Sequence, residues 1–240
     1  MKTAQYKSDK TKIGILLIST WKYNKFIDST IQQIRELFFK NSEVIIYLHT
    51  DSTDKHDADL IIKINHKEWP FVALEKFKTF VENQDKYDCD YLFYLDVDTK
   101  IFKHVNEDIL DDFVVTEHSG YVGKIGTPET NPISKAFIPK SEYTKYICGA
   151  FFGGKKKTFL QIAKLLQENT KSDLQNNYIA IWHDESHLNK YYSQNKNKVK
   201  ILPYSYMYNG TNPQYIVSDP IMIPIHNHEK GFNKFERNKQ

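Results

Sequence analysis

The sequence predicts an α/β protein with an open, mostly parallel, Rossmann-like sheet flanked by helices. Short apolar runs, typical of buried strands, alternate with stretches in which apolar residues recur at helical spacing. This alternation favours parallel strands that are joined by crossover helices. The 240 residues are enough for one domain with a sizeable core.

The first half of the chain supplies the alternating elements in order. Apolar runs that predict buried strands occur at residues 13–18, 44–48, 60–64 and 91–95. Apolar residues at helical spacing occur at residues 27–38 and 71–81. In open α/β sheets, ligands bind beyond the carboxyl ends of the strands. The last of these strands is therefore expected to deliver the residues that follow it to a site.

The second half of the chain is less regular. From about residue 111 the periodicity weakens, and glycines and prolines interrupt the following stretch. Residues 149–154 are glycine-rich and aromatic, which favours either close approach of the backbone to a ligand or a tight turn packed under aromatic rings. Thr158 and Gln161 predict a capping box at the start of a helix. Residues 182–195 predict a final helix.

Composition excludes several classes of protein. Hydrophobic residues make up 40% of the chain and aromatic residues 14%, which argues against disorder. The net charge of +3 gives no reason to expect binding to nucleic acid or to an anionic membrane. Two cysteines, Cys89 and Cys148, are too few for a disulfide scaffold. Without a recognisable signal peptide or apolar span, the protein is expected to be soluble and cytoplasmic.

The first candidate site is the pair Asp96 and Asp98, which follows the apolar run 91–95. Residues two apart in an extended segment point the same way. Two such carboxylates repel each other unless a cation lies between them, and hard oxygen ligands suit Mg²⁺ or Mn²⁺. The alternative is two solvated carboxylates at the end of a strand.

The second candidate site is the cluster at residues 182–187, WHDESH. Acidic residues at the start of a helix would account for Asp184 and Glu185, but not for the neighbouring imidazoles. His183 and His187 are four residues apart and are a conceivable zinc pair, although no third ligand is evident.

Three blocks of sequence carry a resemblance to a known family. Residues 91–102 (YLFYLDVDTKIF), 150–154 (AFFGG) and 181–191 (IWHDESHLNKY) resemble the family of the histo-blood-group A and B transferases and the α1,3-galactosyltransferases, glycosyltransferase family 6. The order and spacing of the blocks also match, and the resemblance covers roughly residues 12–208. The membrane anchor and stem of that family are not found, which is expected of a bacterial or phage catalytic domain.

The resemblance implies a fold and a division of the chain. It implies a metal-dependent glycosyltransferase of the GT-A type, with residues 1–240 as one catalytic domain. Within it, residues 12–110 would form the nucleotide-sugar-binding half. Residues 111–225 would form an irregular half that binds the acceptor and carries the catalytic group, and residues 226–240 a mobile tail.

The resemblance also implies roles for individual residues. The uridine would lie against Ile18, Ser19, Thr20 and Tyr23. The metal motif would comprise Asp96, Val97 and Asp98. Other donor-binding positions would be Lys76, Cys148, Gly149, Ala150, His183 and Asp184. The acceptor would contact His118, Trp182 and Glu185, and Glu185 matches the central catalytic carboxylate. Lys76 replaces an arginine of the family and keeps its charge but not its bidentate fork.

Two basic residues of the tail, Lys230 and Arg237, are candidates to fold over the diphosphate. The alternative for both is a solvated tail.

The function that follows is retaining transfer of GalNAc, or of Gal, from a UDP donor in α1,3 linkage. The acceptor would be a galactose-terminated glycan, with or without fucose, and the cofactor Mn²⁺ or Mg²⁺. Small Cys148 leaves room for the acetamido group of GalNAc, whereas Ala150 weakens that preference. Two alternatives are a catalytically inactive carbohydrate-binding protein and a metal-dependent UDP-sugar hydrolase. Glu185 would act either as a covalent nucleophile or by stabilising a cationic sugar centre.

Overall fold

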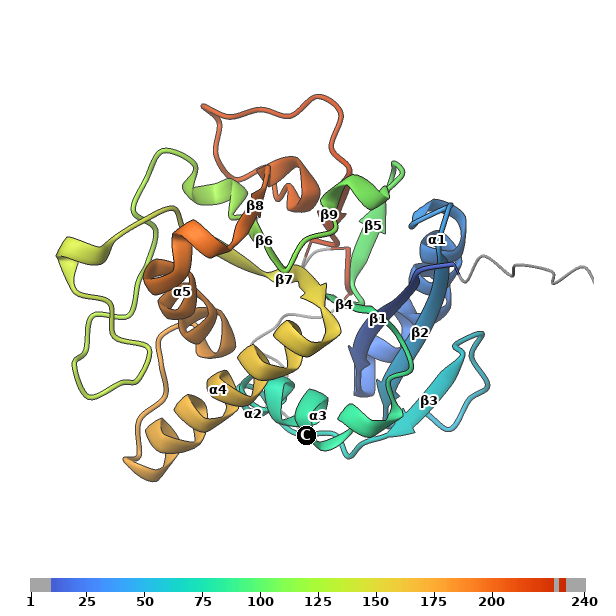
Figure 1. Cartoon of the computed structure of the whole chain (residues 1–240), viewed down its shortest axis with the longest axis horizontal. Helices are drawn as coiled ribbons and strands as arrows, with labels where there is room; N and C mark the ends of the chain where they lie inside the picture. Colours follow the sequence, from blue (N-terminus) through green and yellow to red (C-terminus); the bar gives the residue numbers. More distant parts are fainter. Residues whose placement is uncertain (1–9, 227–228, 232–240) are drawn as a thin grey trace, which may run out of the picture.

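A seven-stranded sheet forms the centre of the protein in the computed structural model, which describes residues 10–226 and 229–231 (Figure 1). The strand order is β3-β2-β1-β4-β7-β6-β8. These strands are β1 (Lys12–Ser19), β2 (Glu43–Thr50), β3 (Leu60–Lys63), β4 (Tyr91–Leu95), β6 (Phe113–Glu117), β7 (Ile147–Lys155) and β8 (Lys200–Leu202). A second sheet pairs β5 (Thr99–Ile101) with β9 (Met222–Pro224) in antiparallel fashion.

The large sheet is open and mostly parallel, as the sequence predicts. The strands β1, β2, β3 and β4 pair in parallel, and β8 is parallel to β6. Within this sheet β7 runs against both of its neighbours, β4 and β6. Strands from residues 12–110 and from residues 111–225 pair in this one sheet, so the two predicted halves share it.

Helices cover both faces of the large sheet. The helices are α1 (Ile27–Leu37), α2 (Phe71–Leu74), α3 (Lys76–Glu82), α4 (Lys156–Gln175) and α5 (His183–Asn195). Short 3-10 turns are η1 (Trp21–Phe26), η2 (Gln84–Lys86), η3 (Glu107–Ile109), η4 (Ser119–Tyr121), η5 (Lys140–Glu142), η6 (Lys196–Lys198) and η7 (Tyr204–Met207). No helix in the described part of the chain is long and apolar enough to cross a membrane.

The alternation of side chains along β1 shows how the two faces are filled. Ile15 and Leu17 point into a buried cluster with Ile31 of α1. Leu16, between them, points into a second cluster with Phe77 of α3 and Phe159 of α4. The helix α1 therefore covers one face of the sheet, while α3 and α4 cover the other (Figure 1).

Several sequence-based expectations are corrected by the structure. The predicted helical stripe 71–81 is divided between α2 and α3 at Glu75. The predicted capping box is wrong, because α4 begins at Lys156 and Thr158 lies inside its first turn.

The tight turn considered for residues 149–154 is also wrong, because these residues belong to the strand β7. Its glycines make room for neighbouring rings and backbone. A Cβ atom on Gly153 would lie 2.3 Å from the ring of Phe93.

Candidate active site

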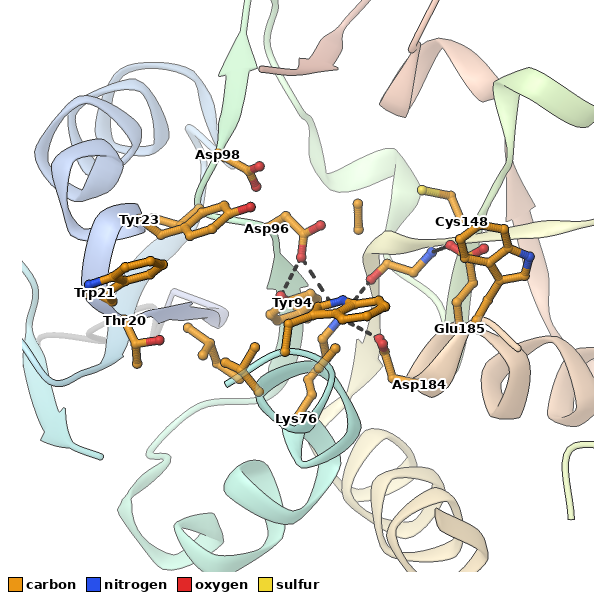
Figure 2. Close-up of a pocket in the computed structure, with 18 of the residues that line it drawn as sticks. Thr20, Trp21, Tyr23, Lys76, Tyr94, Asp96, Asp98, Cys148, Asp184 and Glu185 are labelled. Carbon is orange, nitrogen blue, oxygen red and sulfur yellow. Dashed lines mark hydrogen bonds and ion pairs between the residues drawn. The ribbon is translucent and has the colours of Figure 1, made fainter. Parts of the chain in front are cut away.

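A cavity of about 390 Å³ lies beyond the carboxyl ends of β1 and β4, where sheets of this kind bind ligands. The structure brings most of the predicted site residues together in its lining (Figure 2). These are Ile18, Thr20, Tyr23, Lys76, Asp96, Val97, Asp98, Cys148, Gly149, Ala150, Trp182, Asp184 and Glu185.

Three predicted residues lie outside this lining. Ser19 is buried, and its hydroxyl donates to Asn24 Oδ1 at 2.9 Å. The ring of His183 packs edge-on against that of Trp69, with centroids 4.8 Å apart. His118 accepts a hydrogen bond from Gly120 N at 3.1 Å, and burial lowers the pKa of its imidazole to about 4. His118 is therefore neutral at physiological pH.

Asp96 and Asp98 lie on the link between β4 and β5, which backbone hydrogen bonds hold in place. Asp96 N donates to Ala150 O at 2.9 Å, and Ile225 N donates to Asp98 O at 2.7 Å. The hydroxyl of Tyr94 donates to one carboxylate oxygen of Asp96. The strand end thus presents two carboxylates at fixed positions in the cavity wall.

The electrostatics of this pair fit a divalent cation. Burial raises the pKa of Asp96 to about 6; the negative charge of Asp98 adds to the rise, and Lys76 opposes it. No group of three candidate His, Cys, Asp or Glu ligands occurs within residues 10–226 and 229–231. Mg²⁺ in proteins commonly binds to one or two carboxylates and shares its shell with substrate phosphates, which suits a pair such as Asp96 and Asp98. His187, the other half of the conceivable zinc pair, is buried and faces Asp173.

Lys76 is the central cation of the site. Its ammonium group lies 2.7 Å from Asp184 Oδ2 and 3.9 Å from Asp96 Oδ1, and it donates to Gly149 O at 3.2 Å (Figure 2). It also lies 4.1 Å from the centre of the Tyr94 ring. Burial acts to lower the pKa of Lys76, but the two carboxylates outweigh burial and raise it. The group therefore stays charged and joins α3, α5 and β7.

Glu185, in the first turn of α5, faces Gly149 of β7. One of its carboxylate oxygens accepts a hydrogen bond from Gly149 N at 2.9 Å. A Cβ atom on residue 149 would lie 3.3 Å from Glu185 Cβ, so glycine permits this close approach. Burial raises the pKa of the Glu185 carboxyl to about 7; Asp184 adds to the rise, and the N–H of Gly149 opposes it. The site holds a carboxylate that is costly to ionise.

Lys230, near the end of the described residues, lies on one side of the cavity. Lys230 lines it and forms an ion pair with Asp98, and the ammonium group of Lys25 donates to Lys230 O. Lys230 is therefore buried beside Asp98 and not a solvated tail residue, and its contact with the diphosphate stays a prediction. Arg237, the other basic residue of that expectation, lies outside the described residues.

Sequence reasoning missed several aromatic residues of the lining. These are Trp21, His66, Trp69 and Tyr94. Trp21 begins η1 and His66 lies on the loop before α2, and the centroids of their rings are 5.6 Å apart. Only Tyr94 carried a signal, because its position two residues before Asp96 places both on the same side of an extended chain.

Comparisons with known proteins identify the family of this chain. The model of glycosyltransferase family 6 matches residues 1–232. Histo-blood group ABO system transferase 1 of Rattus norvegicus is 31% identical over 219 residues, which cover 85% of this chain and 63% of the relative. Globoside alpha-1,3-N-acetylgalactosaminyltransferase 1 of Homo sapiens is 29% identical over 224 residues, covering 87% of this chain and 64% of the relative.

A bacterial relative is also similar. O-antigen biosynthesis glycosyltransferase WbnI of Escherichia coli is 28% identical over 194 residues, which cover 77% of this chain and 83% of that protein. The chain spans less than two thirds of the length of the mammalian relatives it matches. Since the family model covers nearly all of it, the chain belongs to glycosyltransferase family 6.

Proposed function

We propose that this protein transfers GalNAc from UDP-GalNAc, with retention and in α1,3 linkage, to a galactose-terminated glycan, with or without fucose. UDP-Gal is the second candidate donor. The observation that carries the proposal is one cavity in which Asp96 and Asp98 lie on one wall and Glu185 lies on another (Figure 2). The name of the Escherichia coli relative supports sugar transfer, and that of the human relative supports GalNAc and the α1,3 linkage.

In this proposal Asp96 and Asp98 hold Mn²⁺ or Mg²⁺. Their oxygens are hard ligands of the kind these ions prefer, and the family is generally metal-dependent. When bound, the ion supplies positive charge that stabilises the departing UDP. The lining carries four carboxylates against two ammonium groups, so an added cation would also reduce repulsion of the negatively charged diphosphate.

The chain's own residues would orient the donor and its reacting carbon. Thr20, Trp21 and Tyr23 offer a half-enclosed surface for the uridine at the end of β1. Gly149 and Lys76 hold the Glu185 and Asp184 carboxylates at the sugar end of the cavity. Glu185 would either attack the anomeric carbon or stabilise its positive charge during attack by the acceptor. In both cases it acts as the ionised carboxylate.

The acceptor would enter beside Trp182, which lines the cavity and keeps 40% of its surface exposed. An exposed indole next to the reacting carbon offers an apolar face for a sugar ring. His118 is the other predicted acceptor contact and stays a prediction, since it lies outside the cavity lining.

The test is kcat/KM for UDP-GalNAc and UDP-Gal on one galactose-terminated acceptor, in the wild type and in Cys148→Met. Cys148 lines the cavity, and a longer side chain there should crowd the acetamido group. We expect the wild type to prefer UDP-GalNAc and Cys148→Met to shift towards UDP-Gal, by a free energy of about 1–3 kcal/mol. A wild type that prefers UDP-Gal tenfold would refute the donor assignment.

The same assay separates the two alternative functions. A carbohydrate-binding protein without catalysis would bind glycan but release no UDP. A UDP-sugar hydrolase would release UDP at the same rate with and without acceptor.

A further inference from the structure

Among the described residues, no other strand completes one edge of β7. Its pairing with β4 covers Phe151 to Lys155 and leaves residues 147–149 without a strand partner on that side. Alternate residues of a strand direct their N–H and C=O groups to the same edge. Ile147 and Gly149 therefore present backbone groups that need partners from elsewhere.

Side chains from two helices complete this edge. Gly149 N donates to Glu185 Oε2, and Gly149 O accepts from Lys76 Nζ. At Ile147, two places before Gly149 in the chain and next to it along this edge, the side chain of Asn189 takes the place of a strand. Its amide oxygen accepts from Ile147 N at 2.8 Å, and its amide nitrogen donates to Ile147 O at 2.9 Å.

Asn189 also binds the main chain of the catalytic candidate. Its amide nitrogen donates to Glu185 O at 2.9 Å, so both N–H donors and the acceptor of the amide are used. Asn189 is 4% exposed, and no water is needed to satisfy it. One side chain thus ties the backbone of Glu185 to the strand residue two places before Gly149.

This link matters because Glu185 lies in the first turn of α5, where helices fray and have few internal bonds. The Glu185 carboxylate must nevertheless keep its hydrogen bond from the N–H of Gly149. We propose that Asn189 is a positioning residue that holds α5 against β7, so that the Glu185 carboxylate remains in reacting position. The inference rests on the proposed transferase function.

The test compares two asparagines of the same helix. Asn195 Nδ2 donates to Tyr191 O at 2.9 Å, the same bond to the fourth preceding carbonyl that Asn189 makes to Glu185, but within the described residues its side chain does not bond to a strand. Asn189→Ser removes the bridge without adding charge, because the shorter hydroxyl cannot replace both amide contacts. Asn195→Ser removes a local bond alone and is the matched control.

We expect Asn189→Ser to lower kcat on the order of 10²-fold, the scale of a small misplacement of a reacting group, with the KM for UDP-sugar changed by only a few-fold. The acidic limb of its pH profile should move to higher pH, because the Gly149 N–H that stabilises the Glu185 carboxylate is less well engaged. The charged and titratable neighbours Asp184, Lys76 and Tyr146 are unchanged. Asn195→Ser should keep kcat within about twofold of wild type.

Activity is counted per UDP-binding site, so that loss of folded protein is not read as loss of kcat. If Asn189→Ser does not fold, Asn189→Leu keeps the volume, removes the amide contacts without adding charge, and should show the same kcat loss. Wild-type kcat per binding site in the Asn189 variant, or equal losses in both asparagine variants, would overturn the positioning role. A wild type that transfers no sugar would instead refute the proposed function.

Discussion

At the scale of single residues, the cavity is defined by an excess of carboxylates over ammonium groups. Lys76 neutralises part of it, and Lys230 pairs with Asp98. Burial raises the pKa values of Asp96 and Glu185, and the remaining negative charge adds to the rise. Such raised values cluster at functional sites, because the same burial that destabilises a free carboxylate strengthens its action on a positive centre.

Glu185→Gln should lower turnover on the order of 10²-fold or more, while donor affinity stays within a few-fold. The amide keeps the shape and can still accept from Gly149 N, but it lacks the charge that would be needed mainly in the transition state. Turnover by single-turnover kinetics and affinity by calorimetry with UDP-sugar would measure the two effects. If affinity falls in parallel with turnover, Glu185 is a binding residue.

The pH dependence should follow the same carboxyl group. Because burial raises the pKa of Glu185 to about 7, kcat should rise with pH up to that value and then level off. The folded protein retains a proton that the unfolded chain loses above its ordinary pKa of 4.5, so this group lowers stability as pH rises between these two values. Glu185→Gln should therefore melt no lower than wild type at pH 8 by calorimetry. A lower melting temperature there would contradict the destabilising role of the charge.

Asp96→Asn and Asp98→Asn should each abolish metal-dependent transfer, since an amide keeps the shape of the side chain but not the charge. Binding of Mn²⁺ in the presence of UDP, followed by electron paramagnetic resonance, gives a readout that does not depend on activity. Asp88→Asn is the control, because Asp88 precedes β4 at the opposite end of the same strand and is exposed. Full wild-type activity in EDTA would rule out the metal site.

At the scale of elements, β7 organises the catalytic wall. Gly149→Ala should lower kcat more than it lowers stability, because the new methyl group would lie 3.3 Å from Glu185 Cβ and 3.4 Å from Glu185 Oε2. These contacts are tight enough to move the carboxylate but not to break the strand. The measurement is kcat beside the thermal unfolding midpoint. A variant with unchanged kcat would show that the close approach is not needed.

The elements differ in how far the sequence predicts them. Apolar runs locate β1, β2 and β4, since these strands are buried on both faces and need little else. The strand β7 is not predicted, because the glycines of residues 149–154 favour a ligand-binding segment or a tight turn. In the structure these glycines make room for neighbouring rings. Similarly, β8 has three residues, and its pairing with β6 depends on residues far along the chain.

In the site too, the sequence predicts what depends on local pattern but not what depends on contacts between distant residues. Asp96 and Asp98 follow from the position of a strand end, which is local information. The contacts of Lys230 with Asp98 and of Asn189 with Ile147 join residues far apart in sequence, and no local pattern encodes such a pair.

At the scale of the whole molecule, the cavity draws residues from Ile18 to Lys230 and from both halves of the sheet. Ligands that fill it should therefore stabilise the entire domain. UDP at one hundred times its dissociation constant in the presence of Mn²⁺ should raise the unfolding free energy by about 2.7 kcal/mol. A single shifted calorimetric transition would support this coupling, whereas one shifted and one unshifted transition would show that the halves unfold separately.

The position of β7, an antiparallel strand between β4 and β6, has a consequence for the order in which the protein folds. Within the sheet, β6 and β8 connect to the parallel strands only through β7. The edge of β4 that faces away from β1 must therefore wait for residues 147–155, and residues 113–117 cannot join the sheet before them. Closing such long loops is slow. On refolding, the first four strands should pair early, and the capacity to bind a nucleotide sugar should be the last property to return.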